Sequence, residues 1–337
     1  MATSKPPVDY LITGATGGLG TAILSTLLKN GVPTSAIAVG STREHLGSTY
    51  EARGLQFRHT NFESITSLMR AFQGVKKLFF VSTNTFDNEK RMQQHRNVVT
   101  AAEQAGVGRV YYSSLGIGGV DGQPHEVDLM VAHLETEKML RQSQLVWTNI
   151  REGVYADAFP VFLNWYPKDP QQVLCLPCDG EVAFALRDEL GEATAKLMMR
   201  DGFEKQNVLL TGPRAIKLSA LASVINQASS RAVRMEFVSD EEYVKRSAQR
   251  DIGRKNEEFF RNWATLLHSF EAGKAATVSP LMGQLLGRQP RDGEQAVRLL
   301  LQRDRDYTWH QNYIKKGEKG ASKGSITEFM KMGCCFV

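Results

Sequence analysis

Apolar residues in the first half of the chain form two alternating kinds of pattern. Short runs with little polar interruption cover residues 8–13, 36–39, 55–59, 77–81, 109–113 and 145–150. Between them, residues 21–29, 89–104 and 127–141 place apolar side chains at helical spacing. Continuous apolar runs are typical of strands buried on both faces of a parallel sheet. The alternation predicts an α/β fold with a doubly wound parallel sheet, which binds its ligand where the strands end.

The pattern becomes less regular after residue 150. Strands are predicted at 173–176, 207–211 and 235–238, and helices near 188–200, 218–228, 240–272 and 292–302. We expect a nucleotide-binding domain over 1–150 and a smaller α/β substrate lobe over 151–302. Residues 303–337 are polar and rich in Lys and Gly, so we expect a mobile basic tail there.

A glycine-rich segment separates the first strand from the first helix. Glycines at 14, 17 and 20 suit a tight turn, close approach of a pyrophosphate, and close packing of the helix on the sheet. Free N–H groups at the helix start then bind phosphate. The sequence therefore predicts a Rossmann dinucleotide site, and a glycine-rich turn without a ligand is the alternative. The predicted contacts are Gly14, Thr16, Gly17, Gly18, Leu19 and Gly20.

The end of the second strand favours NADPH over NADH. An NAD site usually has Asp or Glu there, but this chain has Ser41, Thr42 and Arg43. Two hydroxyls and a guanidinium suit a 2′-phosphate. The alternative is that Arg43 is a solvated residue at a helix start. Further cofactor contacts are expected at Asn61, Phe62, Ser82, Thr83, Lys138 and Gly153.

Several ordered blocks of sequence resemble the NmrA-like branch of the atypical short-chain dehydrogenases, and within it the NAD(P)H:quinone oxidoreductase members. The matching blocks are residues 13–20, 74–82, 94–102, 105–115, 133–140 and 151–155. The resemblance runs from about residue 8 to 300, and 74–155 is its specific part. It implies a Rossmann domain, NADPH and a small lobe over a substrate cleft. Some members of this family reduce quinones or other carbonyls, and others bind NAD(P) as redox-sensing regulators.

The Tyr-xxx-Lys pair of ordinary short-chain dehydrogenases is absent, because the equivalent helix carries Leu129 and His133. The candidate catalytic residues are His133, Tyr155, Ser114 and Lys138. His133 is a candidate proton donor, Ser114 a hydrogen-bond donor to a carbonyl, and Tyr155 a residue beside the nicotinamide. The alternatives are a packing role for His133 and Tyr155 and a turn cap for Ser114.

These residues together predict an NADPH-dependent reductase of a quinone, enone or other small, mostly apolar carbonyl compound. Hydride transfer to an electron-poor ring asks little of the protein beyond orientation. Aromatic residues beside the predicted cleft suit such a substrate: Phe159, Phe162, Trp165 and Tyr166. Their alternative is ordinary burial. Two other functions stay open, a nucleotide-sensing regulator without turnover and a redox-neutral enzyme of the same fold.

Composition narrows the partners and the location. The net charge of +5 lies partly in the last 35 residues, and no basic face indicates nucleic-acid binding. The polar start lacks a signal core, and no apolar stretch approaches the roughly 20 residues of a spanning helix. We expect a cytoplasmic protein, either a monomer or a homodimer. For Cys175 and Cys178 we favour packing over a redox or metal role, because a zinc site needs two more ligands nearby.

The chain ends in Cys334-Cys335-Phe336-Val337, a loose match to a prenylation signal, and five lysines between 315 and 331 precede it. A lipid on Cys334, helped by these lysines, would bring the protein to an anionic membrane surface. The alternative is a chance pair of terminal cysteines.

Overall fold

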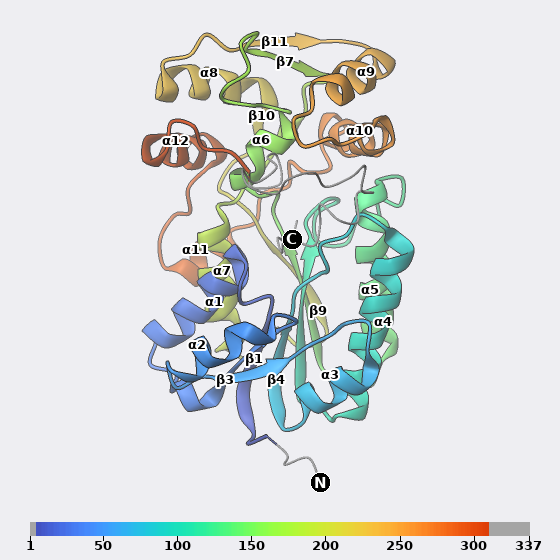
Figure 1. The fold of residues 1–337 in the computed structure, drawn as a ribbon, viewed down its shortest axis with the longest axis vertical. Helices are drawn as coiled ribbons and strands as arrows, with labels where there is room; N and C mark the ends of the chain where they lie inside the picture. The colour runs from blue at the N-terminus through green and yellow to red at the C-terminus, as the bar shows by residue number, and fades with distance from the viewer. Residues whose placement is uncertain (1–4, 310–337) are drawn as a thin grey trace.

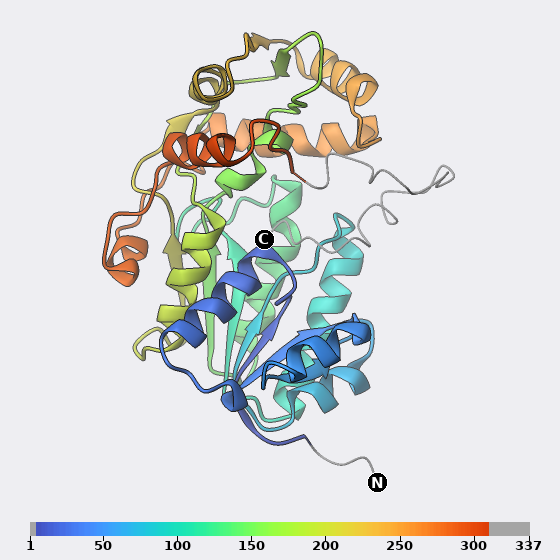
Figure 2. The ribbon, with the colours of Figure 1, turned by 60° about the vertical axis from the view of Figure 1, so that its left-hand side comes forward.

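The computed structural model describes residues 5–309, and it has two parts stacked along the long axis of the molecule (Figure 1). The lower part is a twisted sheet between two layers of helices. The upper part is a lobe of helices and two short strand pairs, which sits over the edge where the sheet strands end (Figure 2). A ligand bound at this edge therefore lies between the two parts.

All neighbouring strands of the central sheet run parallel, in the order β3-β2-β1-β4-β5-β6-β9. The strands are β1 (Val8–Thr13), β2 (Ile37–Ser41), β3 (Gln56–His59), β4 (Val75–Phe80), β5 (Arg109–Leu115), β6 (Trp147–Glu152) and β9 (Gln206–Leu210). The order reverses between β1 and β4, and this switch point is where doubly wound sheets bind dinucleotides. The predicted fold class is confirmed.

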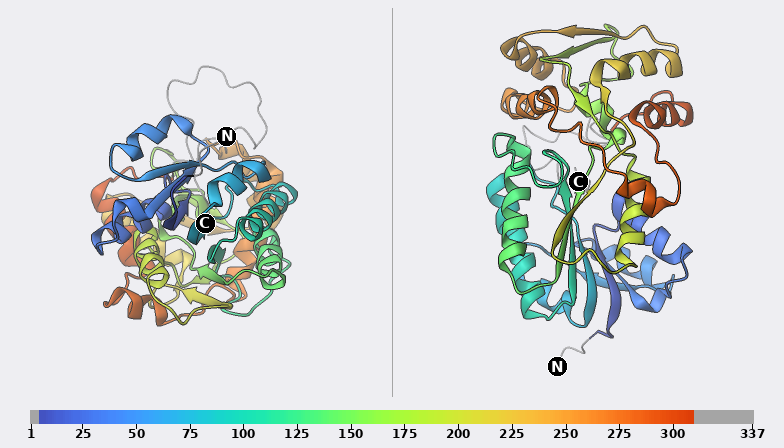
Figure 3. Two further views of the ribbon diagram at one scale, coloured as in Figure 1. Left: turned by 90° about the horizontal axis from the view of Figure 1, so that it is seen from below. Right: turned by 180° about the vertical axis from the view of Figure 1, so that it is seen from behind.

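Helices cover both faces of the sheet (Figure 3, left). On one side lie α1 (Gly18–Lys29), α7 (Arg187–Met198) and α11 (Leu281–Leu286), and on the other α3 (Ile65–Phe72), α4 (Asn88–Gln104) and α5 (Asp128–Gln142). The short α2 (Gly47–Glu51) packs near β3. Helices α1 and α7 pack so closely that a Cβ on Gly191 would lie 2.4 Å from the Cβ of Ala22. This contact fixes the start of α7 beside the start of α1.

The strand at 206–210 corrects the predicted domain division. We expected it in the substrate lobe, but β9 pairs with β6 and extends the central sheet. Helix α7, also expected in the lobe, packs on α1 in the helix layer of the sheet. The chain thus returns to the first domain after residue 150. Local pattern could not reveal this return, because the partner strand β6 lies more than 50 residues earlier in the sequence.

The lobe contains two strand pairs and several helices. Strand β7 (Val173–Leu176) pairs with β11 (Arg234–Phe237) in parallel, and β8 (Glu181–Val182) pairs with β10 (Ile216–Lys217) antiparallel. The helices are α6 (Phe159–Phe162), α8 (Leu218–Ser229), α9 (Asp240–Arg250), α10 (Glu257–Glu271) and α12 (Gly293–Arg303). One continuous apolar core runs from the α1 face of the sheet into this lobe. The lobe is therefore held firmly over the strand ends.

The start of the predicted mobile tail is packed against the lobe, which corrects that expectation for residues 304–309. Tyr307 stacks on Phe159 and donates a hydrogen bond to the carbonyl of Asp157 (3.0 Å). Trp309 is only 1% exposed and lies against the guanidinium of Arg187. The rest of the tail, including Cys334 and its proposed lipid, lies outside the described residues.

Candidate functional site

The glycine segment forms a bare turn between β1 and α1. Gly14 has a φ of +64°, and a Cβ there would lie 2.5 Å from Val81 Cγ1. A Cβ on Gly20 would lie 2.5 Å from the carbonyl oxygen of Gly14, so both positions exclude a side chain. Helix α1 begins at Gly18, and its N-cap residue, Gly17, offers no side chain to cap the first N–H groups. An open helix start of this kind suits a phosphate group.

The other predicted residues of this turn differ in burial. Thr16 and Gly18 are half-buried on the turn. The side chain of Leu19 is buried in the core, so only its backbone faces the helix start. The six predicted residues thus lie together in the turn between β1 and α1 and in the first turn of that helix. They would contact a ligand mostly through main-chain atoms.

Arg187, which the sequence analysis did not select, lies directly over this turn. A Cβ added to Gly18 would lie 2.5 Å from Arg187 Nε and Cζ. Its backbone N–H donates to Asp157 (2.9 Å), and its guanidinium stacks on Trp309 at 4.5 Å from the ring centroid. The buried Nε has no hydrogen-bond partner within residues 5–309. An unsatisfied guanidinium N–H beside an open helix start indicates an anion site.

The end of β2 brings the three predicted 2′-phosphate ligands together. Ser41 Oγ accepts a hydrogen bond from the backbone N–H of Arg43 (3.1 Å), which turns the chain away from the strand. Thr42 is exposed, and Arg43 is partly buried. No hydrogen bond or ion pair to the Arg43 guanidinium occurs among the described residues, so this cation is available to an added phosphate.

Four other predicted cofactor contacts have local structural roles. Asn61 Oδ1 accepts from the backbone N–H of Glu63 in the turn after β3 (2.9 Å), where Phe62 packs edge-on against Phe80. The backbone N–H of Gly153 donates to Leu210 (2.7 Å), so this glycine allows β6 and β9 to approach closely. Exposed Lys138 pairs with Glu135 on the surface of α5 (3.7 Å), and its catalytic and cofactor roles stay predictions.

A buried histidine fixes the chain after β4. The backbone N–H of Thr83 donates to His95 Nε2 (3.1 Å), and the N–H of Ser82 donates to Ser113 (3.0 Å). His95 Nδ1 donates to Thr136, whose hydroxyl in turn donates to a helix carbonyl. This chain of bonds requires the neutral imidazole, and burial with nearby Arg91 holds its pKa well below the usual range. Ser82 and Thr83 are thereby fixed just after β4, and their contact with a cofactor stays a prediction.

His133 occupies a second buried network, which corrects its predicted role as a proton donor. Its Nε2 accepts from Arg91 (2.9 Å), and its Nδ1 donates to the hydroxyl of Tyr112 (2.8 Å). The side chain is fully buried, and burial followed by the charge of Arg91 lowers its pKa well below the usual value. Both nitrogens are occupied within the protein, so His133 positions the layer behind the sheet edge.

Ser114 is held by a buried ion pair. Its hydroxyl donates to Glu137 Oε1 (2.6 Å), and the same carboxylate receives two bonds from Arg151 (2.9 and 2.7 Å). Arg151 also donates to the carbonyls of Gly119 and Gly122 in the loop after β5 (3.0 and 2.9 Å). The predicted carbonyl-binding and turn-capping roles of Ser114 are both replaced by this internal bond. The cluster shapes the loop that borders the site.

Tyr155 lies beside an acid that the sequence analysis did not select. Its hydroxyl donates to Glu152 Oε2 (2.5 Å) at the carboxyl end of β6. Glu152 is fully buried, and its other oxygen has no hydrogen-bond partner among residues 5–309. Burial raises the pKa of Glu152 to about 8, against a smaller opposing effect of the Tyr155 hydrogen bond. Glu152 is therefore a neutral acid at neutral pH, placed at the binding edge of the sheet.

The aromatic residues expected to line the cleft belong to the lobe core. Phe159 stacks on Trp165 (5.3 Å between ring centroids), and Phe162 stacks on Trp263 (5.5 Å). These side chains and Tyr166 are at most 4% exposed. The alternative of ordinary burial is thus the correct one, and the four residues support the lobe from within.

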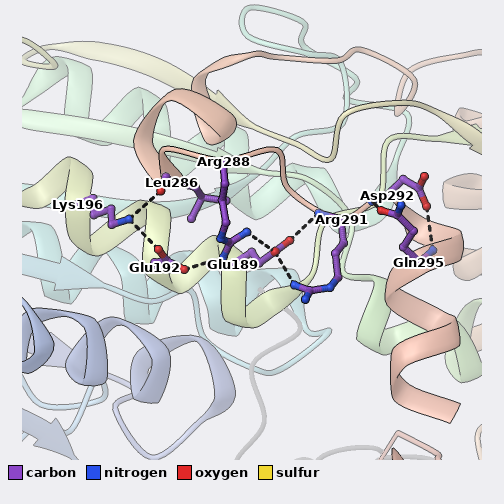
Figure 4. A network of polar contacts seen from close by, with 8 residues as sticks. All are labelled: Glu189, Glu192, Lys196, Leu286, Arg288, Arg291, Asp292 and Gln295. Atoms are coloured by element: carbon purple, nitrogen blue, oxygen red, sulfur yellow. Dashed lines mark hydrogen bonds and ion pairs between the residues drawn. The ribbon is translucent and has the colours of Figure 1, made fainter. Parts of the chain in front are cut away.

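A surface hollow of about 430 Å³ lies elsewhere, lined by Arg288, Gln289, Arg291 and Gln295. Its arginines lie beside α7 and point to Glu189 and Glu192 (Figure 4). Arg288 and Arg291 both bind the carboxylate of Glu189 (2.6 and 2.8 Å), and Arg288 also binds Glu192. Because these charges are neutralised within the protein, we place the functional site at the sheet edge.

A model of the NmrA-like family matches residues 9–280. The chain belongs to the NmrA-like family. It is 46% identical over 309 residues to the NmrA-like family domain-containing oxidoreductase flvB of Aspergillus flavus, covering 91% of this chain and 99% of that protein. It is 30% identical over 247 residues to quinone oxidoreductase 2 of Escherichia coli, covering 72% and 81%.

A solved structure extends the likeness to the fold. The triphenylmethane reductase of Citrobacter sp., complexed with NADP(H), superimposes with a TM-score of 0.76 at 28% identity, covering 86% of this chain and 99% of that one. The predicted resemblance is confirmed, and this NmrA-like chain is an oxidoreductase. Within residues 5–309, no helix is both long and apolar enough to cross a membrane.

Proposed function

We propose that the protein reduces a small, mostly apolar quinone, enone or other carbonyl compound with NADPH. The observation that carries this proposal is the neutral Glu152–Tyr155 pair at the same sheet edge as the glycine turn. Reduction of a carbonyl oxygen needs a proton, and this pair can supply one. Relatives named quinone oxidoreductase 2 and triphenylmethane reductase support a substrate with an electron-poor conjugated system.

The residues present fit NADPH along the whole edge. Gly14 and Gly20 leave a cradle that a Cβ would fill, and Arg187 adds an unsatisfied N–H over it, which suits the pyrophosphate. Ser41 and Arg43 at the end of β2 suit the 2′-phosphate of the adenosine half. The ends of β5 and β6, across the switch point, would hold the nicotinamide half.

Bound NADPH supplies a hydride to the substrate. Tyr155 donates its hydroxyl proton to the substrate oxygen that gains negative charge. When the Tyr155 O–H turns from Glu152 to the substrate oxygen, the protonated Glu152 becomes the donor in the bond between the two side chains and passes its proton to the phenolic oxygen. Glu152 becomes a carboxylate and regains a proton from solvent before the next turnover. The protein side chains thus deliver one proton for each hydride.

Steady-state NADPH oxidation with a panel of quinones, enones and azo or triphenylmethane dyes tests the function. We expect turnover of at least one quinone above the background rate. If the protein binds NADPH but oxidises it with none of these compounds, the redox-sensing alternative is favoured. Conversion of a compound without NADPH consumption would favour the redox-neutral alternative.

Replacing Arg43 with glutamate should shift the cofactor preference from NADPH toward NADH. The variant loses charge-assisted bonds to the 2′-phosphate and gains a repulsive charge, so we expect NADPH affinity to fall about 10- to 100-fold. NADH lacks this phosphate, so its affinity should change only a few fold. Calorimetric titration of both cofactors measures the difference. Arg53→Glu, an equal charge change on an exposed residue, is the control, and unchanged NADPH binding in Arg43→Glu would contradict the assignment.

Replacing Arg187 with methionine should weaken NADPH and NADH equally. The pyrophosphate is common to both cofactors, and one lost charged hydrogen bond corresponds to about a tenfold or larger rise in Kd. Arg200→Met, just past the other end of α7, should leave both affinities unchanged. A selective loss of NADPH binding in Arg187→Met would instead assign this arginine to the 2′-phosphate.

A further inference from the structure

A group of metal-ligating side chains lies in the lobe, separate from the glycine turn and the Glu152–Tyr155 pair. Cys178, His268 and Glu271 place one sulfur, one nitrogen and one oxygen within 4.8 Å of one another. Cys178 follows β7, and the other two residues lie one turn apart at the end of α10. A Cβ on Gly180 would lie 2.4 Å from the backbone nitrogen of Glu271, so close backbone packing fixes Cys178 beside the helix end.

The three side chains have the chemistry and spacing of zinc ligands. His268 Nδ1 lies 3.3 Å from Glu271 Oε2. Two ligands bound tetrahedrally at about 2.0 Å from a zinc ion are themselves about 3.3 Å apart. The Cys178 thiol is buried, 5% exposed, and no hydrogen bond to it occurs among the described residues. A buried thiol without a partner, aimed at an imidazole and a carboxylate, suits a borderline divalent cation.

A second shell orients the histidine. His268 Nε2 lies 2.8 and 3.0 Å from the two carboxylate oxygens of Asp240, the first residue of α9. A hydrogen bond from Nε2–H to Asp240 leaves the lone pair of Nδ1 for a metal, which is the usual carboxylate–histidine–zinc arrangement. The negative charges of Asp240, Glu271 and Asp179 all lie close enough to Cys178 to interact with it electrostatically. The local charge therefore also favours a cation.

We propose that Cys178, His268 and Glu271 bind one Zn²⁺ ion, with Asp240 as the outer carboxylate and water at the fourth position. The side chains of His268 and Glu271 are 41% and 57% exposed, so the ion can enter from solvent. Binding displaces the thiol proton of Cys178 to solvent. The ion joins the end of β7 to α10, and through Asp240 it also fixes the start of α9. This site revises our expectation that the Cys175/Cys178 pair serves packing alone, because Cys178 finds its co-ligands about 90 residues further along the chain.

Zinc binding to the full-length protein tests the site, in a background where Cys334 and Cys335 are serine. We expect one Zn²⁺ per chain by competition with a chromophoric chelator, and a rise in Tm that EDTA reverses. Cys178→Ala should lower the affinity by at least about 100-fold. Asp240→Asn, an outer-shell change, should lower it by about 10- to 100-fold. Cys175→Ala, which removes the neighbouring buried thiol, should retain full affinity.

Cobalt substitution gives a readout that reports the sulfur directly. We expect a thiolate-to-cobalt charge-transfer band in the background protein and in Cys175→Ala, and its loss in Cys178→Ala. If Cys178→Ala fails to fold, Glu271→Gln, an exposed change, keeps the test, because it should weaken zinc while the circular dichroism spectrum is unchanged. Absence of stoichiometric zinc, or equal zinc affinity in Cys178→Ala or in Glu271→Gln, would overturn the proposal. NADPH oxidation is not needed for any of these measurements.

Discussion

Replacing Arg151 with methionine is expected to lower the free energy of unfolding by about 3–5 kcal/mol. The arginine makes two hydrogen bonds to Glu137 and two to carbonyls of the loop after β5, and both charged side chains are fully buried. Methionine keeps most of the volume but leaves the Glu137 carboxylate without its buried counter-charge. An uncompensated buried charge is among the most destabilising changes in a protein. Urea unfolding followed by circular dichroism measures the loss.

A matched control acts on the same carboxylate from its other side. Arg141 lies 3.5 Å from Glu137 and is 38% exposed, so Arg141→Met should cost less than about 1 kcal/mol. Removing both buried charges in Arg151→Met/Glu137→Met should recover roughly half of the loss, because no charge is then left unpaired. Equal losses of unfolding free energy in Arg151→Met and Arg141→Met would show that removing the buried partner of Glu137 costs no more than removing the exposed one.

The parts of the site that sequence could predict are those that one short segment determines. The glycines at 14, 17 and 20 sit between a strand and a helix, and the backbone they form allows few other uses. Arg43 comes just after the end of β2 at Ser41, so its place at the sheet edge follows from the strand alone. Main-chain geometry and strand direction are local properties, and for that reason the bare glycine turn and the position of Arg43 were predictable.

The parts that sequence could not predict depend on contacts between distant segments. Arg187 reaches Gly18 only because α7 packs on α1, about 170 residues later in the chain. Strand β9 joins β6 after the chain has passed through the lobe. Nothing in the local sequence around 187 or 207 separates these segments from the lobe that precedes them. Long-range packing therefore places Arg187, whose buried Nε has no hydrogen-bond partner among the described residues, over the glycine turn.

Side-chain state was the other quantity that sequence could not supply. His133 is a plausible acid by residue type, but complete burial and Arg91 make it neutral and occupied. Glu152 shows the opposite effect. Its residue type suggests an ionised carboxylate at neutral pH, but burial raises its pKa and keeps it a neutral acid that can donate a proton. Gly153 marks a close approach of backbone segments, but the approaching carbonyls belong to Leu210 at the end of β9 and Ala183 after β8. A residue's type limits its chemistry, and its burial and partners decide which part of that chemistry is used.

Replacing Tyr155 with phenylalanine, or Glu152 with glutamine, is expected to lower kcat for quinone reduction by at least about 100-fold. Either change breaks the route by which the proton reaches the substrate oxygen. Because the two residues act in series, the double variant should be no slower than the slower single variant. Tyr166 offers a matched control, since its buried hydroxyl bonds the carboxylate of Asp251 elsewhere in the lobe. Tyr166→Phe should leave kcat within a few fold of the wild type.

The pH dependence gives the sharper test of the same pair. With a pKa of about 8 for Glu152, the acid is protonated at neutral pH and becomes a carboxylate as the pH rises through that value. The kcat of the wild type should therefore be constant up to about pH 7 and then fall, approaching tenfold per pH unit well above the pKa. Glu152→Gln has no proton to lose, so its residual kcat should not decline in this range. A wild-type kcat that stays constant to about pH 10, or a decline that persists in Glu152→Gln, would show that Glu152 does not supply the proton.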